Sequence, residues 1–555
     1  MKGMNMRNRL NIVTLGIIPI LFGCSESTTI GSRIESGEAL DGRARPNILF
    51  VLADDLGFTD LGSFGSEIPT PNLDKLALAG LRFTNLHTAA NCTPSRIMIF
   101  SGAGGDTAYQ RDPRYIDEPS VRGVGGGVLG LNYASLAELL QDSGYKTYMT
   151  GKWDLGYMEG YSPGTRGFDR SFALLGMSAS YFREPLQPTV LPFENDGQRI
   201  DIEDLPEDFY STKYFTDKIL DYLQSHEGDA PWFAYIPYNA VHWPLQVPDD
   251  WLDRHSGRYD GGYDLLRQER VTQAEKLGVI PEGATLANYK PLATPWNELS
   301  LEQQRRYSRA QEIYASVLEY MDMSIGRITD YLEETGQLDN TLVLFASDHG
   351  GSASESGVDP AASLRETVNR DNSFENFGRP MSYIDHGEGF AEAATAPFRD
   401  YKATLSEGGL RAASFISYPA AIPGGDVSHT FLSLMDILPT LLDIAKTEHP
   451  GAGEYKGRQI NNVLGRSFWP YATGLAETVH EPTDTVAIFR QGAAAFYKNN
   501  YKIVNEVHPS MGMGTNIGSW RLYNIAMDPG EHHDLATEFP HLIDELTTEL
   551  ENNWR

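Results

Sequence analysis

The stretch Asn47-Ile48-Leu49-Phe50-Val51-Leu52-Ala53-Asp54-Asp55 decides the fold of this chain. From Ile48 to Ala53 it is an unbroken apolar run, short and rich in residues that favour strands. Such a run is typical of a parallel strand whose two faces are both covered by helices. Open α/β sheets place their ligands at the carboxyl ends of their strands, where Asp54 and Asp55 stand. The stretch therefore predicts an α/β fold with a functional site at these carboxylates; the alternative is a solvated turn.

Three further strand-like segments also run directly into polar residues. These are residues 341–347 before Asp348 and His349, residues 144–150 before Lys152 and Asp154, and residues 232–238 before His242. Taken alone, each strand end could be an ordinary turn, and each polar side chain that follows could serve only in packing. Their ordered alternation of strand end and polar side chain favours one shared site at the carboxyl edge of a sheet.

Cys92 is the only cysteine of the expected folded body, because the other cysteine, Cys24, lies in a leader segment. Pro94 suits the first position of a helix, where a missing N–H costs nothing, and Ser101-Gly102 should end that helix. Cys92 is therefore expected at a helix N-terminus, whose free amides and dipole favour an anion. The alternative is a buried, unreactive cysteine at a helix start.

The segment Cys92-Thr93-Pro94-Ser95-Arg96 resembles the Cys-x-Pro-Ser-Arg signature of the formylglycine-dependent sulfatases, in the alkaline phosphatase superfamily. The resemblance implies that a formylglycine-generating maturation enzyme oxidises Cys92 to an aldehyde. In this family the hydrated aldehyde attacks a sulfate ester with one oxygen and expels sulfate by collapse from the other. It also implies a large, mostly parallel mixed sheet sandwiched by helices, with a smaller C-terminal antiparallel sheet and helix.

The resemblance also implies a metal site. The segment Ser347-Asp348-His349-Gly350 is similar to the family's second metal-binding motif. Asp54, Asp55, Asp348 and His349 would then surround one divalent cation together with the oxidised Cys92. Calcium fits the carboxylate count best, with magnesium or manganese as alternatives. Asp348 is the carboxylate that we expect to take the proton from the nucleophile.

The resemblance also implies roles for four further residues: three cations around the formylglycine and the sulfate, and one acid. Arg96 would hold and polarise the formylglycine, and Lys152 and Lys402 would bind the sulfate. His242 would serve the leaving oxygen, because histidine can donate a proton near neutral pH. Cations around a dianionic transition state provide the electrostatic stabilisation that such chemistry needs.

Asp154 is a departure from the family pattern. The segment Gly151-Lys152-Trp153-Asp154-Leu155-Gly156 resembles Gly-Lys-Trp-His-Leu-Gly, whose histidine hydrogen-bonds the formylglycine. An aspartate can accept a hydrogen bond but brings no positive charge to an anion. Asp154 could still accept a proton from a gem-diol hydroxyl, and we keep it among the catalytic candidates.

The first residues predict an exported bacterial protein. A basic start is followed by an apolar run over residues 10–22 that is too short to span a bilayer. Leu21-Phe22-Gly23-Cys24 resembles a bacterial lipobox, which implies a lipid anchor on Cys24 and a periplasmic location. The alternative is ordinary signal cleavage and a free periplasmic protein. We expect a signal peptide at 1–24, a tether at 25–45, a catalytic domain at 46–456 and a C-terminal subdomain at 457–555.

The composition and net charge limit the kinds of molecule that this chain is expected to bind. The chain of 555 residues carries a formal net charge of −30, which argues against nucleic acid as a partner. We expect hydrolysis of a sulfate ester on a sulfated saccharide, with aryl sulfates as surrogate substrates. The alternatives are a phosphonate monoester or phosphodiester hydrolase with the same nucleophile, and a non-catalytic binder of sulfated glycans.

Overall fold

A computed structural model describes residues 45–111, 127–184, 193–281, 291–355, 357–358, 370–507 and 516–554. The expected signal peptide and the tether up to residue 44 lie outside the described residues, and both stay predictions. None of the described helices is long and apolar enough to cross a bilayer.

The apolar run from Ile48 to Ala53 lies in a central strand of the main sheet. Strand β1 (Asn47–Ala53) lies parallel between β10 (Thr341–Ser347) and β9 (Trp232–Pro237). Its alternate side chains enter two separate hydrophobic cores: Ile48, Phe50 and Leu52 enter one, and Leu49, Val51 and Ala53 enter the other. Burial on both faces explains why the run is apolar without a period of two.

The described part of the main sheet has 11 strands in the order β12-β2-β11-β10-β1-β9-β5-β6-β7-β8, with β13 also paired to β2. Strand β11 runs antiparallel to both neighbours, and β7 and β8 form an antiparallel edge. The remaining bounds are β2 Leu81–His87, β5 Lys146–Lys152, β6 Arg170–Leu174, β7 Phe193–Asn195, β8 Gln198–Ile200, β11 Arg411–Ser417, β12 Asp426–Ser428 and β13 Leu432–Ser433. The predicted mostly parallel mixed sheet is confirmed.

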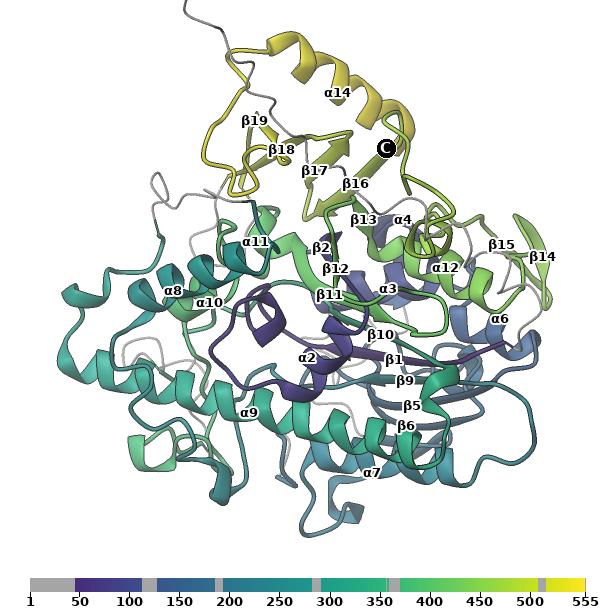
Figure 1. Cartoon of the computed structure of the whole chain (residues 1–555), viewed down its shortest axis with the longest axis horizontal. Coiled ribbons are helices and arrows are strands. Elements are labelled where there is room, and N and C mark those ends of the chain that lie inside the picture. The colour runs from purple at the N-terminus through teal and green to yellow at the C-terminus, as the bar shows by residue number, and fades with distance from the viewer. Residues whose placement is uncertain are drawn as a thin grey trace, which may run out of the picture.

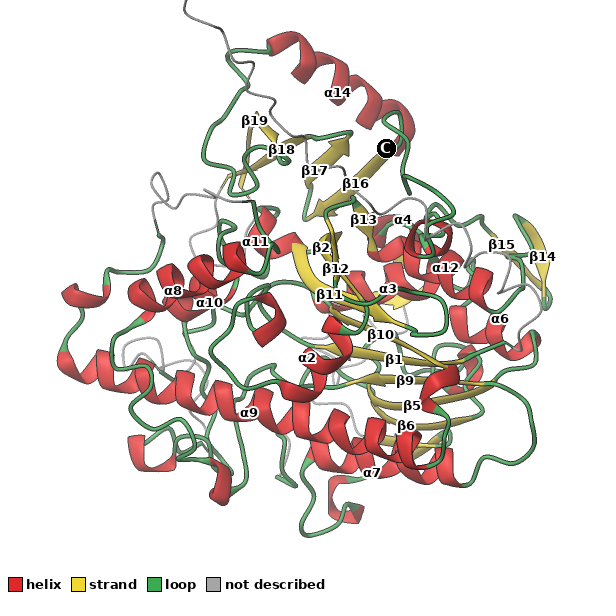
Figure 2. Ribbon diagram, viewed as in Figure 1, coloured by secondary structure: helices red, strands yellow, loops and turns green. Residues whose placement is uncertain are grey.

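Helices cover both faces of this sheet (Figures 1 and 2). One face packs against α2 (Pro71–Leu78), α7 (Ser211–Gln224) and the long α9 (Leu301–Glu334). The other packs against α3 (Cys92–Ser101), α6 (Leu136–Asp142) and α12 (Ile437–Ile444). Smaller elements are α4 Gly105–Ala108, α8 Tyr263–Lys276, α10 Glu388–Ala394, α11 Glu407–Leu410, α13 Trp469–Ala472, the pair β3 Tyr109–Arg111 with β4 Gly127–Leu129, and the pair β14 Gly453–Tyr455 with β15 Arg458–Ile460.

The C-terminal part is a separate antiparallel sheet with one helix, as the resemblance implied. Its strands are β16 Thr485–Arg490, β17 Ala493–Lys498, β18 Tyr501–Val507 and β19 Asn516–Asn524, and α14 spans Pro540–Trp554. Sheet and helix share their own small core around Phe496, Leu522 and Leu546. Figure 1 shows this unit above the edge of the main sheet that carries β2 and β13. The β14–β15 hairpin spans the expected domain boundary at 456/457, which stays a prediction.

Candidate active site

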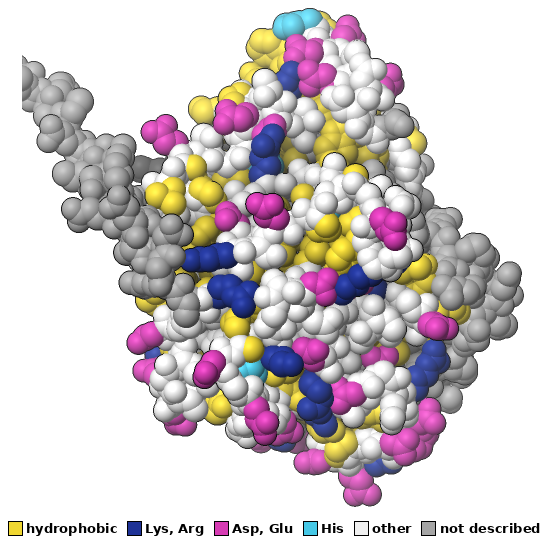
Figure 3. All heavy atoms as spheres, turned by 90° about the vertical axis from the view of Figure 1, so that its right-hand side faces the viewer, with side chains coloured by type: hydrophobic (Ala, Val, Ile, Leu, Met, Phe, Trp, Pro, Cys, Tyr) yellow, Lys and Arg dark blue, Asp and Glu magenta, His cyan; other side chains and the backbone are white. Residues whose placement is uncertain are grey.

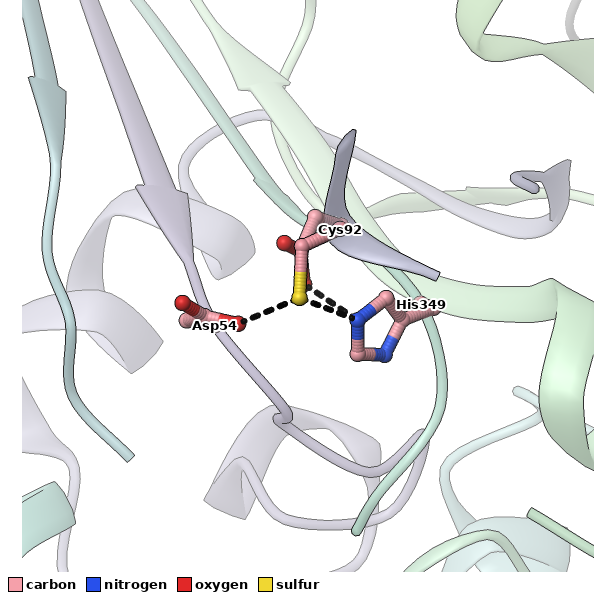
Figure 4. A group of neighbouring side chains, drawn as sticks. Asp54, Cys92 and His349 are labelled. Carbon is pink, nitrogen blue, oxygen red and sulfur yellow. Dashed lines mark hydrogen bonds and ion pairs between the residues drawn. The ribbon is translucent and has the colours of Figure 1, made fainter. Parts of the chain in front are cut away.

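Cys92 lies at the start of α3, with Asn91 as the extended N-cap residue. The sequence predicted Pro94 at the first position of this helix. The helix begins at Cys92, so Pro94 is its third residue. Proline fits anywhere in this first turn, because the first N–H groups of a helix have no intrahelical partner. The Cys92 Sγ atom lies between two side chains, 3.5 Å from Asp54 Oδ1 and 3.2 Å from His349 Nε2 (Figure 4).

Two neighbouring parallel strands bring the predicted metal ligands together. Asp54 and Asp55 follow β1, and Asp348 and His349 follow β10, whose last residue pairs with the last residue of β1. Asp55 has φ 64°, a left-handed conformation that aspartate tolerates. Its N–H lies 3.4 Å from Asp348 Oδ1, so the two strand ends contact each other directly.

The donor set fits a divalent cation. One ligand atom each from Asp54, Cys92, Asp348 and His349 lies within 4.8 Å of all the others. His349 Nδ1 lies 2.9 Å from the Gly350 carbonyl, which can only accept, so Nδ1 carries the proton and Nε2 keeps its lone pair. The Oδ2 atom of Asp55 is buried without a hydrogen-bond partner among the described residues. Carboxylate oxygens and an imidazole nitrogen are ligands that divalent metals take.

Three buried or nearly buried cations surround these carboxylates. Lys152 Nζ lies 2.5 Å from Asp54 Oδ2, and Lys402 Nζ lies 2.5 Å from Asp55 Oδ1. Arg96 contacts Asp348 Oδ2 at 3.1 Å and donates to the Lys152 carbonyl at 2.6 Å. Burial raises the pKa of Asp54, but Lys152, His242 and Arg96 together hold it well below its usual range. The site therefore combines negative ligands for a cation with positive groups for an anion.

The surroundings of Cys92 do not favour a reactive thiolate. Burial raises the pKa of its thiol well above the usual range, and the neighbouring Asp54 carboxylate raises it further. Reactive cysteines have lowered pKa values and partly exposed, electropositive surroundings. The encoded side chain is thus a protonated thiol in a centre built for charged groups.

Asp154 follows β5 in a left-handed turn, with φ 54°. Its Oδ2 atom accepts a hydrogen bond of 2.8 Å from Thr93 Oγ1, the residue after Cys92. Burial raises the pKa of this carboxyl group. The structure therefore links Asp154 to the start of α3 through Thr93, a partner that the sequence pattern did not indicate.

His242 lies on the other side of the metal ligands. Its Nδ1 donates to the Trp243 carbonyl at 2.5 Å, and its Nε2 lies 3.6 Å from Asp55 Oδ2. Burial, the largest cause, lowers the pKa of His242 to about 4. The indole of Trp243 stacks on the imidazole, with ring centroids 5.3 Å apart, and meets Tyr383 edge-on at 5.0 Å. The sequence pattern assigned no role to Trp243 or to Tyr383, which belongs to a distant loop without a motif.

The chain is similar to known sulfatases over most of its length. A model of the family described as Sulfatase matches residues 46–447. An uncharacterised sulfatase of Schizosaccharomyces pombe is 38% identical over 517 residues, which cover 90% of this chain and 92% of that protein. An arylsulfatase of Klebsiella aerogenes is 33% identical over 409 residues, which cover 72% of this chain and 87% of that protein. The solved structure of Ps i-CgsB in complex with k-i-k-neocarrahexaose has the same fold, with a TM-score of 0.62, 21% identity and 92% of each chain covered.

Proposed function

Because this chain belongs to the sulfatase family and is a sulfuric ester hydrolase, we propose that it desulfates a saccharide by means of a formylglycine made from Cys92. One observation carries the proposal. The side chain of Cys92 lies at a helix N-terminus, against Asp54 and His349. Lys152, the last residue of β5, and Arg96, one turn along α3, both contact the Asp54 carboxylate.

Each residue of the centre has a task that its contacts suggest. The Arg96 guanidinium is held from two sides, by Asp348 and by the Lys152 carbonyl, so its position beside the cation-site carboxylates is fixed. Lys152 and Lys402 each pair with one carboxylate of the cation site. With those carboxylates coordinated to a cation, both ammonium groups are available to the sulfate oxygens. The Trp243 carbonyl holds Nδ1 of His242 and burial lowers its pKa to about 4, so His242 would serve the leaving oxygen through Nε2 only when its imidazole is protonated.

The metal and the modified residue supply the remaining chemistry. Sulfatases generally use a divalent metal and a formylglycine. Asp54, Asp348 and His349 would hold the metal together with Asp55, whose Oδ1 lies 3.4 Å from His349 Nε2, and calcium suits a set dominated by carboxylates. The hydrated aldehyde would supply one hydroxyl oxygen that bonds to sulfur as the ester S–O bond breaks, and a second hydroxyl that, on losing its proton, would re-form the aldehyde as the carbon–oxygen bond to sulfate breaks. A carboxylate oxygen of Asp348 lies within 4.8 Å of Cys92 Sγ, a position from which it could accept the proton of the attacking hydroxyl.

A saccharide substrate is supported by the surroundings of His242. The half-buried face of Trp243 beside the leaving-group histidine offers a flat apolar surface to a sugar or aryl ring. The structural relative Ps i-CgsB was solved with k-i-k-neocarrahexaose bound. Aryl sulfates would be accepted as surrogates because the same surface stacks on an aromatic ring.

The proposal is tested by the mass of the tryptic peptide that carries residue 92, from protein made with its maturation machinery. Formylglycine replaces a sulfur and two hydrogens with one oxygen, so we expect a lighter peptide than the encoded one. The same preparation should hydrolyse 4-nitrophenyl sulfate, and Cys92→Ala should abolish this. Faster turnover of an aryl phosphodiester would favour phosphorus chemistry. An intact thiol without turnover of either ester would leave the glycan-binding alternative.

A further inference from the structure

A cavity away from the active site lies where the main domain meets the C-terminal sheet. The cavity has a volume of about 460 Å³. Its lining residues come from β2, from the segment after α8, from the start of β11 and from the turns of the C-terminal sheet. Its apolar wall includes Val279, Ile280, Phe398, Phe431, Val486 and Ile525. Neither Cys92 nor any of the metal-ligand candidates lines it.

Arg411 gives this cavity a buried cationic group. It is the first residue of β11, and its side chain is only 8% exposed. The Nε atom lies 2.7 Å from Glu407 Oε2, and the guanidinium carbon lies 4.8 Å from the centre of the Phe398 ring. Within the part of the chain that the structure describes, the terminal nitrogens of Arg411 make no hydrogen bond. Arg411 lines the cavity with these donors unused, so this group suits an incoming anion that can accept from both.

The carboxylate beside Arg411 is already shared among other donors. Glu407 accepts from His87 Nε2 at 3.0 Å, from the Tyr497 hydroxyl at 2.9 Å and from Lys502 Nζ at 2.9 Å. Lys502 in turn lies 2.8 Å from Glu531. Glu407 and Glu531 together balance the charges of Arg411 and Lys502, and Arg411, whose terminal nitrogens make no hydrogen bond within the described residues, still presents them to the cavity that it lines.

The other charged groups that line the cavity are held by partners or lie at its rim. His480 donates to Asp436 at 2.8 Å, and Asp484 accepts from Arg466 at 2.6 Å. The side chain of Glu481 is exposed. Of the two acidic side chains that line the cavity, Glu481 is therefore exposed, and the charge of Asp484 is neutralised by Arg466.

We propose that this cavity binds a small organic anion, whose acidic group accepts hydrogen bonds from Arg411 and whose apolar body packs between Phe398 and Phe431. Arginine binds carboxylate, sulfate and sulfonate groups with two parallel N–H donors. The aromatic walls favour a planar or ring-shaped body. This site is separate from the sulfate ester that the active site cleaves.

The test uses benzenesulfonate, which has a ring and a sulfonate but no ester bond to hydrolyse. Its binding to the full-length protein is measured by titration calorimetry. Ala526→Trp fills the cavity from an exposed position on the rim, and Met527→Trp, 83% exposed and outside the lining, is the matched control. Arg411→Lys keeps a cation beside Glu407, whereas Arg411→Gln removes it.

We expect Ala526→Trp and Arg411→Gln to weaken benzenesulfonate binding about tenfold or more, and Met527→Trp to leave it unchanged. Arg411→Lys should retain part of the affinity. Hydrolysis of aryl sulfate by Ala526→Trp should match the parent, which separates this site from the proposed active site. Equal binding by Ala526→Trp and Met527→Trp, or a crystal soak with benzenesulfonate only beside Cys92, would overturn the proposal.

Discussion

Trp243 is the residue through which the active site would select its substrate. It is half-buried, stacks on His242 at 5.3 Å and is supported edge-on by Tyr383. A stacked aromatic contact contributes about 1 kcal/mol. We therefore expect Trp243→Ala to raise KM for aryl sulfates about fivefold, with a smaller effect on kcat, and Trp243→Phe to recover most of the loss. Trp469→Ala, at a half-buried tryptophan on α13, is the control. Equal KM values for Trp243→Ala and this control would contradict the role.

Thr93 ties the unusual Asp154 to the start of α3. Its hydroxyl donates to Asp154 Oδ2 at 2.8 Å, next to the residue that would be modified. Thr93→Val keeps the shape but removes the donor, which leaves a buried carboxylate less satisfied. We expect kcat for aryl sulfate to fall about tenfold with KM unchanged, while Thr93→Ser retains activity. If the valine and serine variants have the same kcat, this hydrogen bond does not position residue 92.

The sequence was most informative about residues at strand ends. Asp54 and Asp348 could be predicted to meet, because each follows an apolar run long enough for one buried strand. The partner of Asp154 could not, because a short loop decides whether a side chain faces Cys92 or its neighbour Thr93. Nor does any motif mark Tyr383, which reaches Trp243 through the fold alone.

At the scale of elements, Gly151 sets the approach of β5 to β9. Its φ of 134° is left-handed, and a Cβ atom there would lie 2.0 Å from the Pro237 carbonyl oxygen. Gly151→Ala must separate the two strands and displace the adjacent Lys152. We expect a loss of about 3 kcal/mol in the free energy of unfolding, measured by urea denaturation. Gly164→Ala, with nothing within 4 Å of its new Cβ, should change little. Similar midpoints for both variants would refute this account.

His480 joins a loop to the N-cap of α12 and should make stability depend on pH. Its Nε2 lies 2.8 Å from Asp436 Oδ2, and although burial opposes protonation, Asp436 and Asp484 raise the pKa of His480 above 6.5. The folded state then holds this proton more tightly than the unfolded state. Protonated His480 therefore contributes fully to the free energy of unfolding below pH 6.5, and this contribution is lost as pH rises through the pKa of the folded state.

A His480→Gln variant removes this proton and therefore the pH dependence that it causes. We expect the parent to be more stable than the variant by about 1 kcal/mol at acidic pH, and this difference to shrink as pH rises above neutrality. Thermal or urea unfolding of both proteins across that range measures it. A stability difference that does not change with pH would show that His480 is not protonated in the folded state.

Most helices and strands could be predicted from the sequence. The exceptions are the first residue of α3, near Pro94, and the cavity, whose walls come from distant segments. The start of α3 lies two residues before Pro94, because a whole first turn tolerates the missing N–H. The strands around β1 were predictable from uninterrupted apolar runs. The cavity beside Arg411 was not, since its walls come from segments as distant as Thr84 and Ile525.

At the scale of the whole molecule, the net charge of −30 does not gather into one acidic face in the view of Figure 3. Acidic side chains there are scattered among neutral and basic ones. The anion-binding groups are buried instead, in the active site and beside Arg411. Buried charges are screened little by salt, so local cations can bind anions within an acidic protein.

Lys502 is the charge that holds the C-terminal sheet to the main domain. It is fully buried on β18, 2.9 Å from Glu407 on α11 and 2.8 Å from Glu531. Lys502→Met would leave two buried carboxylates without their shared cation, which costs about 3 to 5 kcal/mol. Lys498→Met removes a lysine from the same sheet whose ion pairs are partly exposed, and should cost at most about 1 kcal/mol.

Urea unfolding of both variants, followed by circular dichroism and by tryptophan fluorescence, measures these losses. Because Glu407 follows Lys402 by a short segment, we also expect folded Lys502→Met to hydrolyse aryl sulfate more slowly than Lys498→Met. The C-terminal sheet would then support catalysis by fixing the segment that carries a sulfate-binding lysine. Equal stability and equal turnover in the two variants would show instead that the sheet is attached through its apolar contacts alone.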